Sequence, residues 1–160
     1  MSRSPGRGVR VAHTFTDLLT HAVFSTSERA PFLSDSIRLD VHAYIGGILR
    51  EMRATPIAIG GTSDHIHLLF CLPADKSVAD CIRTVKTNSS RWVKEKWPDR
   101  RSFAWQRGYG AFSVSQSNRA AVIRYVQDQA RHHMRLSFRD ELVALLKKHG
   151  VEFEEEYLWR

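Results

Sequence analysis

The sequence is poor in cysteine and has no long apolar run. Cys71 and Cys81 are its two cysteines, and their spacing matches neither a zinc knuckle nor a redox pair. We therefore expect both to be buried reduced thiols, as in a cytosolic protein. No run of about 18 apolar residues occurs, so no transmembrane helix is predicted. No apolar signal core follows the basic residues 1–10, so we expect a flexible N-terminal arm on a cytoplasmic, nucleoid-associated protein.

Negative charge is in the minority. The chain carries 24 Lys and Arg residues against 17 Asp and Glu residues, which gives a formal net charge of +7. That balance favours a polyanionic partner, and nucleic acid is the commonest one. Hydrophobic residues make up 42% of the sequence, which argues against wholesale disorder. No repeat or linker divides the chain, so we expect a single domain over residues 1–160.

Hydrophobic periodicity predicts four strands and four helices. The order β-α-β-β-α-β-α-α indicates an α+β fold, a ferredoxin-like (RRM-like) split βαβ antiparallel sheet with extra C-terminal helices. Strand order 4-1-3-2 would place the third strand inside the sheet. The expected strands are 13–26, 55–60, 65–71 and 109–115, with a turn at 60–64 before the histidine strand. The expected helices run from Ser34 to about Arg53, from Ser77 to before Pro98, from Ser117 or Asn118 through Tyr125, and from about Phe138 to Lys148.

Two histidines one residue apart, His65 and His67, are the strongest chemical signal. Side chains alternate along a strand, so both imidazoles point to one face and can bind one ion. Tyr125 and Gln129 are four apart in a helical pattern and share a helix face. A phenol nucleophile, an amide oxygen and two imidazoles form a plausible metal-assisted phosphoryl-transfer site. Asp64 could orient His65 or His67 by a hydrogen bond. It also belongs to a glycine-rich turn, and we favour a role in that turn.

Each of these residues also has a simpler explanation. Buried histidines that are satisfied by hydrogen bonds are common, and a helix tyrosine is usually a packing residue. The combination on a basic chain of one domain is what favours a catalytic site.

Basic and aromatic residues alternate through the segment 83–109. Phosphate contacts combined with stacking rings are the components of a surface that binds single-stranded nucleic acid. We expect Arg83, Lys86, Arg91 and Arg107 to contact DNA, with Lys86 as the main phosphate contact. The alternative is that these charges form only a solvated face.

The ordered set of motifs resembles the single-tyrosine HUH transposases, a family that includes insertion-sequence transposases and REP-associated tyrosine transposases. The resemblance covers nearly the whole chain. Its motifs are His13-Thr-Phe-Thr, His21-Ala-Val-Phe-Ser-Thr, Asp64-His-Ile-His-Leu-Leu-Phe, Val85-Lys-Thr-Asn-Ser-Ser-Arg-Trp92, Trp105-Gln-Arg-Gly-Tyr-Gly-Ala-Phe-Ser-Val-Ser115, the tyrosine helix and Leu145-Leu-Lys-Lys-His-Gly with Tyr157-Leu-Trp.

The resemblance implies that His65, His67 and Gln129 ligate a divalent metal, Mg²⁺ or Mn²⁺. It also implies a DNA transposase in which Tyr125 attacks single-stranded or hairpin DNA and forms a covalent tyrosine–DNA intermediate, and it implies a homodimer. Two alternatives remain open. One is a non-catalytic single-stranded nucleic-acid binding protein on the same scaffold, and the other is a metal-dependent phosphodiesterase that uses water. Neither needs Tyr125 as a nucleophile.

Overall fold

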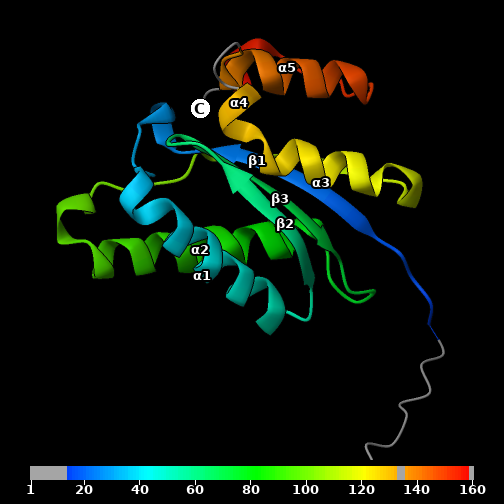
Figure 1. Ribbon diagram of the computed structural model, residues 1–160, viewed down its shortest axis with the longest axis horizontal. Helices are drawn as coiled ribbons and strands as arrows, with labels where there is room; N and C mark the ends of the chain where they lie inside the picture. The colour runs from blue at the N-terminus through cyan, green and yellow to red at the C-terminus, as the bar shows by residue number, and fades with distance from the viewer. Residues whose placement is uncertain (1–13, 133–135, 159–160) are drawn as a thin grey trace, which may run out of the picture.

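The fold is built on a four-stranded antiparallel sheet with helices on both faces (Figure 1). The structure is a computed structural model and describes residues 14–132 and 136–158, without the side chains of residues 131 and 132. The strands are β1 (Leu19–Ser25), β2 (Thr55–Gly61), β3 (His65–Cys71) and β4 (Gly110–Ser113). Their order is β2-β3-β1-β4, which confirms the predicted α+β topology and the internal position of the histidine strand.

Helices α1 (Asp35–Glu51) and α2 (Val78–Lys96) cover one face of the sheet (Figure 1). Their apolar positions recur at helical spacing and pack on alternate residues of the strands, among them Phe24 and Phe70. The hydroxyl of Ser77 accepts a hydrogen bond from the Asp80 amide at 3.0 Å and so caps α2 as expected. This side of the sheet holds the main hydrophobic core.

The C-terminal helices cover the opposite face (Figure 1). They are α3 (Arg119–Gln127), α4 (Gln129–His132) and α5 (Phe138–Lys148). Sequence periodicity predicted one helix through Tyr125 and Gln129, but Asp128 leaves the helical conformation at φ −95° and ψ 22°. Gln129 therefore opens a new helical segment. Short 3-10 turns lie at Ser27–Arg29, Pro98–Arg100, Gln116–Asn118 and Glu155–Tyr157.

The first and fourth strands are shorter than predicted. The first strand starts at Leu19 because Leu19 pairs with Cys71, the last residue of β3, and residues 14–18 have no strand beside them. The fourth strand covers only the four residues that pair with β1. The predicted arm at residues 1–10 lies outside the described residues. Cys81 is buried as expected, whereas Cys71 is partly exposed, and both are free thiols.

Gly60 lets α3 approach the sheet closely. A Cβ atom at this position would lie 1.9 Å from the backbone oxygen of Val126, so any side chain would push the helix away. Gly60 pairs with His67 on the neighbouring strand. The glycine therefore allows the helix that carries Tyr125 to lie directly beside the histidine strand. Within the described ranges, no helix is both long enough and apolar enough to cross a membrane.

Candidate active site

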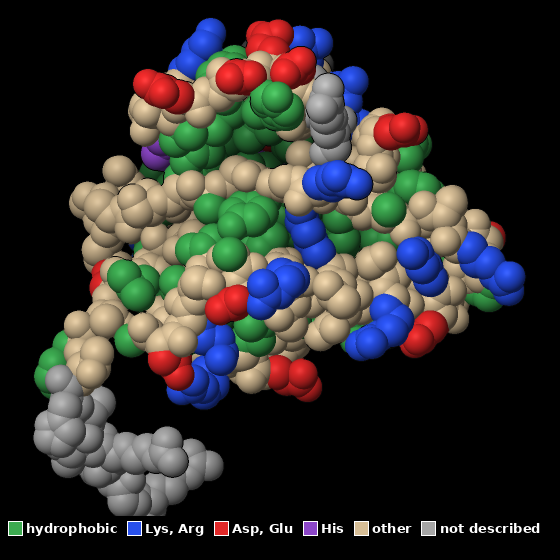
Figure 2. Space-filling view, turned by 180° about the vertical axis from the view of Figure 1, so that it is seen from behind, with side chains coloured by type: hydrophobic (Ala, Val, Ile, Leu, Met, Phe, Trp, Pro, Cys, Tyr) green, Lys and Arg blue, Asp and Glu red, His purple; other side chains and the backbone are tan. Residues whose placement is uncertain are grey.

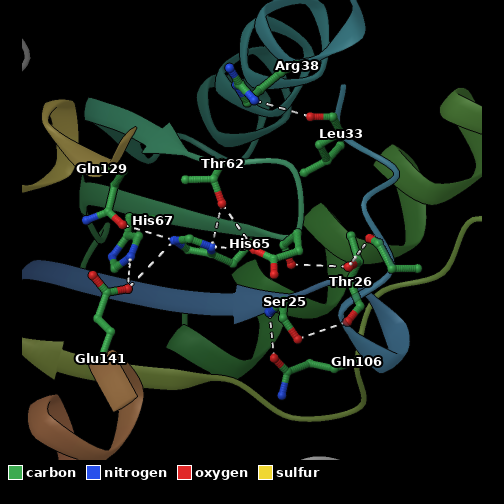
Figure 3. Close-up of polar contacts among 12 residues, drawn as sticks. Ser25, Thr26, Leu33, Arg38, Thr62, His65, His67, Gln106, Gln129 and Glu141 are labelled. Carbon is green, nitrogen blue, oxygen red and sulfur yellow. Dashed lines mark hydrogen bonds and ion pairs between the residues drawn. The ribbon is translucent and has the colours of Figure 1, made fainter. Parts of the chain in front are cut away.

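His65 and His67 lie on the same face of β3, as the alternation predicted, and both side chains are fully buried. They pair across the sheet with Ser25 and Val23 of β1. The same face is covered by α5, and the Phe138 ring stacks on His65 with 4.8 Å between the ring centroids. Figure 3 shows the two imidazoles with Gln129 and Glu141 directed toward one another.

Asp64 sets the orientation of His65. Its Oδ1 atom lies 2.8 Å from Nδ1 of His65. The Thr62 hydroxyl lies 2.9 Å from the same nitrogen (Figure 3) and 3.1 Å from the Asp64 carboxylate. An ionised carboxylate can only accept, so Nδ1 donates to Asp64 and Nε2 faces the interior. Of the two roles considered for Asp64, these contacts favour the orientation of His65 over the turn alone.

His67 is held from both ring nitrogens. Its Nε2 lies 2.8 Å from Oε1 of Glu141, and its Nδ1 lies 2.8 Å from Nε2 of His21. Burial, and then the positive charge that His67 would carry, lower the pKa of His21 to about 3. His21 is therefore a neutral imidazole that fixes His67 without adding charge.

Gln129 reaches the histidines as predicted. Its side-chain oxygen lies 2.9 Å from Nε2 of His65, and its amide nitrogen donates to the backbone oxygen of Tyr125 at 3.1 Å. Tyr125 and Gln129 therefore remain close together although the helix is interrupted at Asp128. The buried Gln129 amide thus points its oxygen toward Nε2, the nitrogen through which His65 would bind a metal.

Glu141 is the functional residue that sequence reasoning missed. It lies in the first turn of α5 and is 1% exposed, with one carboxylate oxygen 3.7 Å from Nε2 of His65 and 2.8 Å from Nε2 of His67. Ligand atoms of these three residues all lie within 4.8 Å of one another. An acidic residue after a helix-capping serine is ordinary in sequence, so it gave no signal of this role.

The donor set fits a divalent cation. A buried carboxylate is costly unless a positive charge or hydrogen bonds compensate for it. Two imidazole nitrogens and a carboxylate oxygen suit Mn²⁺, and oxygen donors such as Glu141 and Gln129 also suit Mg²⁺. The buried group of His65, His67 and Glu141 could therefore bind a metal.

Tyr125 joins this cluster through its hydroxyl, which donates a hydrogen bond to Oε2 of Glu141. Burial, followed by the hydrogen bond and charge of Glu141, raises the pKa of Tyr125 far above its usual range. The phenol is therefore protonated in this state. The structure brings the partly buried Tyr125 together with the buried side chains of His65, His67 and Gln129 in one site.

The four predicted DNA-binding residues lie elsewhere, but they lie together. Arg83, Lys86, Arg91 and Arg107 line one groove of about 870 Å³ between α2 and the segment 101–109. Figure 2 views the molecule from the side of α2 and shows Lys and Arg side chains spread along this surface.

Lys86 differs from the other three basic residues of the groove. Its ammonium donates to the backbone oxygens of Gln106 at 2.8 Å and Gly108 at 2.6 Å, and burial lowers its pKa to about 8. It also lies 4.9 Å from the centre of the Phe24 ring. These contacts tie the segment 106–108 to α2. Lys86 therefore positions this segment, in addition to its predicted contact with a DNA phosphate.

Comparison with known protein families gives one match over most of the chain. Residues 14–129 match the family described as transposase IS200 like. The chain belongs to this family. That result confirms the resemblance inferred from the motifs and supports a DNA transposase as the class of enzyme. The comparison with curated proteins gave no match.

Two solved structures share the fold of this IS200-like transposase. A protein from Deinococcus radiodurans R1 assigned as a transposase has a TM-score of 0.61 and 20% identity, and the match covers 81% of this chain and 98% of the other. A REP-associated tyrosine transposase bound to a REP hairpin has a TM-score of 0.55 and 14% identity, with 79% and 70% covered. At these identities the likeness concerns the fold.

Proposed function

We propose that this protein cleaves and rejoins single-stranded DNA through a covalent intermediate on Tyr125. The observation that carries the proposal is the hydrogen bond from the Tyr125 hydroxyl to Glu141, within the buried group that also contains His65 and His67. A tyrosine that serves only packing does not need its hydroxyl beside two potential metal ligands and a carboxylate. Membership in a transposase family indicates that the reaction of these residues is DNA strand transfer.

The reaction conserves the energy of the broken bond. The Tyr125 oxygen attacks the scissile phosphorus, and its proton passes to a base, for which Glu141 is the group in contact. One bridging oxygen leaves and takes up a proton, becoming the hydroxyl of the released strand end. The new tyrosine–phosphate diester can be attacked by a hydroxyl from another strand, which restores Tyr125 and exchanges strands without ATP.

His65 and His67, with an oxygen from Gln129 or Glu141, would hold Mg²⁺ or Mn²⁺. When bound, such a cation supplies a Lewis acid that stabilises negative charge on the scissile phosphate. The surrounding residues fix the ligands. Asp64 holds the proton on Nδ1 of His65, and His21 locks the ring of His67. A non-catalytic binding protein would have no use for this arrangement.

The proposal is tested by incubating the protein with end-labelled single-stranded DNA and a divalent cation, followed by a denaturing gel. A labelled band at the mass of protein plus DNA is expected. A metal-dependent phosphodiesterase would give cleaved DNA without that band, and a non-catalytic binder would give neither. Location at the nucleoid follows from this function and stays a prediction.

We propose single-stranded or hairpin DNA as the partner of the basic groove. One structure of similar fold is bound to a REP hairpin, which is consistent with such a partner. Rings in the groove, such as Tyr109, can stack only on bases that are not already paired and stacked. Binding should therefore favour hairpin or single-stranded DNA over perfect duplex.

The groove gives a salt prediction. Arg107→Ala is expected to reduce the slope of log K against log salt by about 0.7, the share of one phosphate contact on a single strand. Fluorescence anisotropy at several salt concentrations measures the slope. Arg53→Ala is the matched control, because Arg53 is bound to Asp75 outside the groove. Equal affinity for duplex and hairpin, or a flat salt response, would show that the groove is only a solvated surface.

We also propose a homodimer, since strand exchange requires two DNA ends to be held at once and each chain offers one Tyr125. Analytical ultracentrifugation at micromolar concentration is expected to show a species of twice the 18.4 kDa chain mass. A monomer that retains full strand-transfer activity would refute the dimer.

A further inference from the structure

A second cavity lies directly beside Tyr125, on the opposite side of the sheet from the basic groove. It has a volume of about 320 Å³ and lies between the end of β4, α3 and α5. Its walls include Val114, Asn118, Val122, Tyr125, Leu145 and Lys148. We propose that this cavity binds one unpaired nucleotide next to the scissile phosphate and so determines which sequence is cut. The inference rests on the proposed role of Tyr125.

The size and walls of the cavity suit a single nucleotide. A volume near 300 Å³ is the lower limit for small-ligand pockets, and it has no room for a base pair. Val114, Val122 and Leu145 provide apolar surface for the faces of a base. A base that is stacked in a duplex could enter only by leaving the stack, which costs least in single-stranded DNA.

The rim of the cavity carries polar groups that can recognise the edge of a base and a phosphate. Asn118 is exposed at the start of α3, and its amide can both donate to and accept from the edge of a base. Lys148 is exposed in the last turn of α5, where its ammonium can contact a phosphate. An apolar interior with a base-reading amide and a cation at its mouth matches the chemistry of a nucleotide.

His149 adds a fixed ring to the wall. Its Nδ1 donates to the backbone oxygen of Leu145 at 2.8 Å, and its ring stacks on Phe112 with 4.3 Å between centroids. A ring held on one nitrogen and one face can offer a stacking edge to a ligand at low entropic cost. The pocket is thus partly organised before DNA binds.

The pocket also adjoins the catalytic residues. His21 and Tyr125 both line it. His21 is hydrogen-bonded to His67, and Tyr125 is hydrogen-bonded to Glu141. A base held here would place its own phosphate within reach of the Tyr125 hydroxyl. Recognition and cleavage would then be coupled, because a strand without the correct base would not be positioned for attack.

The test uses labelled single-stranded oligonucleotides that carry an abasic sugar at single positions around the bond that the wild-type protein cuts. One abasic position is expected to lower the rate of adduct formation by roughly 5- to 150-fold, which corresponds to the loss of one stacked base. Ala121→Trp should lower the rate on the intact strand and remove the sensitivity to that abasic position, because Ala121 is an exposed residue that lines the pocket.

Ala120→Trp is the matched control. Ala120 is the exposed neighbour of Ala121 on α3 and does not line the pocket, so this variant should behave like the wild type. Equal rates for the two tryptophan variants, or a wild-type protein insensitive to abasic sugars at every position, would overturn the pocket while leaving the nucleophile intact. Absence of any adduct on the intact strand would instead overturn the proposed function, and the pocket with it.

Discussion

Replacing His65 or His67 by alanine is expected to abolish DNA cleavage and to weaken Mn²⁺ binding by at least about 100-fold. Partners that merely orient a metal ligand contribute 10- to 100-fold to affinity, so loss of the ligand itself should reach or exceed the upper value. Both side chains are fully buried, with Nε2 atoms facing Glu141. Calorimetric titration with Mn²⁺ measures the affinity, and adduct formation after chelation and Mn²⁺ restoration measures the activity.

His42→Ala provides the control for this experiment. His42 lies on α1, on the other side of the sheet, so its loss removes an imidazole without touching the site. The Mn²⁺ affinity and the activity of the His42→Ala variant should equal those of the wild type. Full activity of His65→Ala or His67→Ala under the restored conditions would rule out a metal role for that histidine.

Tyr125→Phe is expected to reduce covalent attachment to DNA by roughly ten-thousand-fold or more, the scale seen when a nucleophile is removed. Phenylalanine keeps the ring and removes only the hydroxyl, so the fold and the DNA affinity should change little. Glu141 loses one donor but keeps its contact with His67. A quantitative denaturing gel measures the adduct, and fluorescence anisotropy measures the affinity.

Tyr44→Phe makes the same chemical change outside the site. Tyr44 belongs to α1, where its ring stacks on Trp92 at 4.2 Å between centroids. This variant should form the adduct normally. A normal yield from Tyr125→Phe would show that another group is the nucleophile, and cleavage without any adduct would favour the use of water.

The topology and the two histidines could be predicted because their signals are local. Alternation along β3 places His65 and His67 on one face regardless of what covers that face. The spacing of Tyr125 and Gln129 gave their proximity, although the helix breaks between them at Asp128. In both cases the residues that meet are neighbours in sequence.

Glu141 could not be predicted, because its position depends on how α5 packs on the sheet. Phe138 and Leu142 are buried in the same cluster as Val23, and this packing places the carboxylate against the histidines. No periodic pattern links Glu141 to β3 across 74 residues of sequence. The backbone partners of Lys86 were hidden for the same reason, since they come from the fold of the segment 106–108.

The central claim is that Tyr125 carries the DNA during the reaction. Its most direct test is to form the complex between the wild-type protein and single-stranded DNA, digest it with protease and nuclease, and map the modified peptide by mass spectrometry. The account predicts a nucleotide esterified to Tyr125 in the peptide that contains α3. A nucleotide on any other residue, or cleaved DNA with an unmodified Tyr125 at every time point, would contradict it.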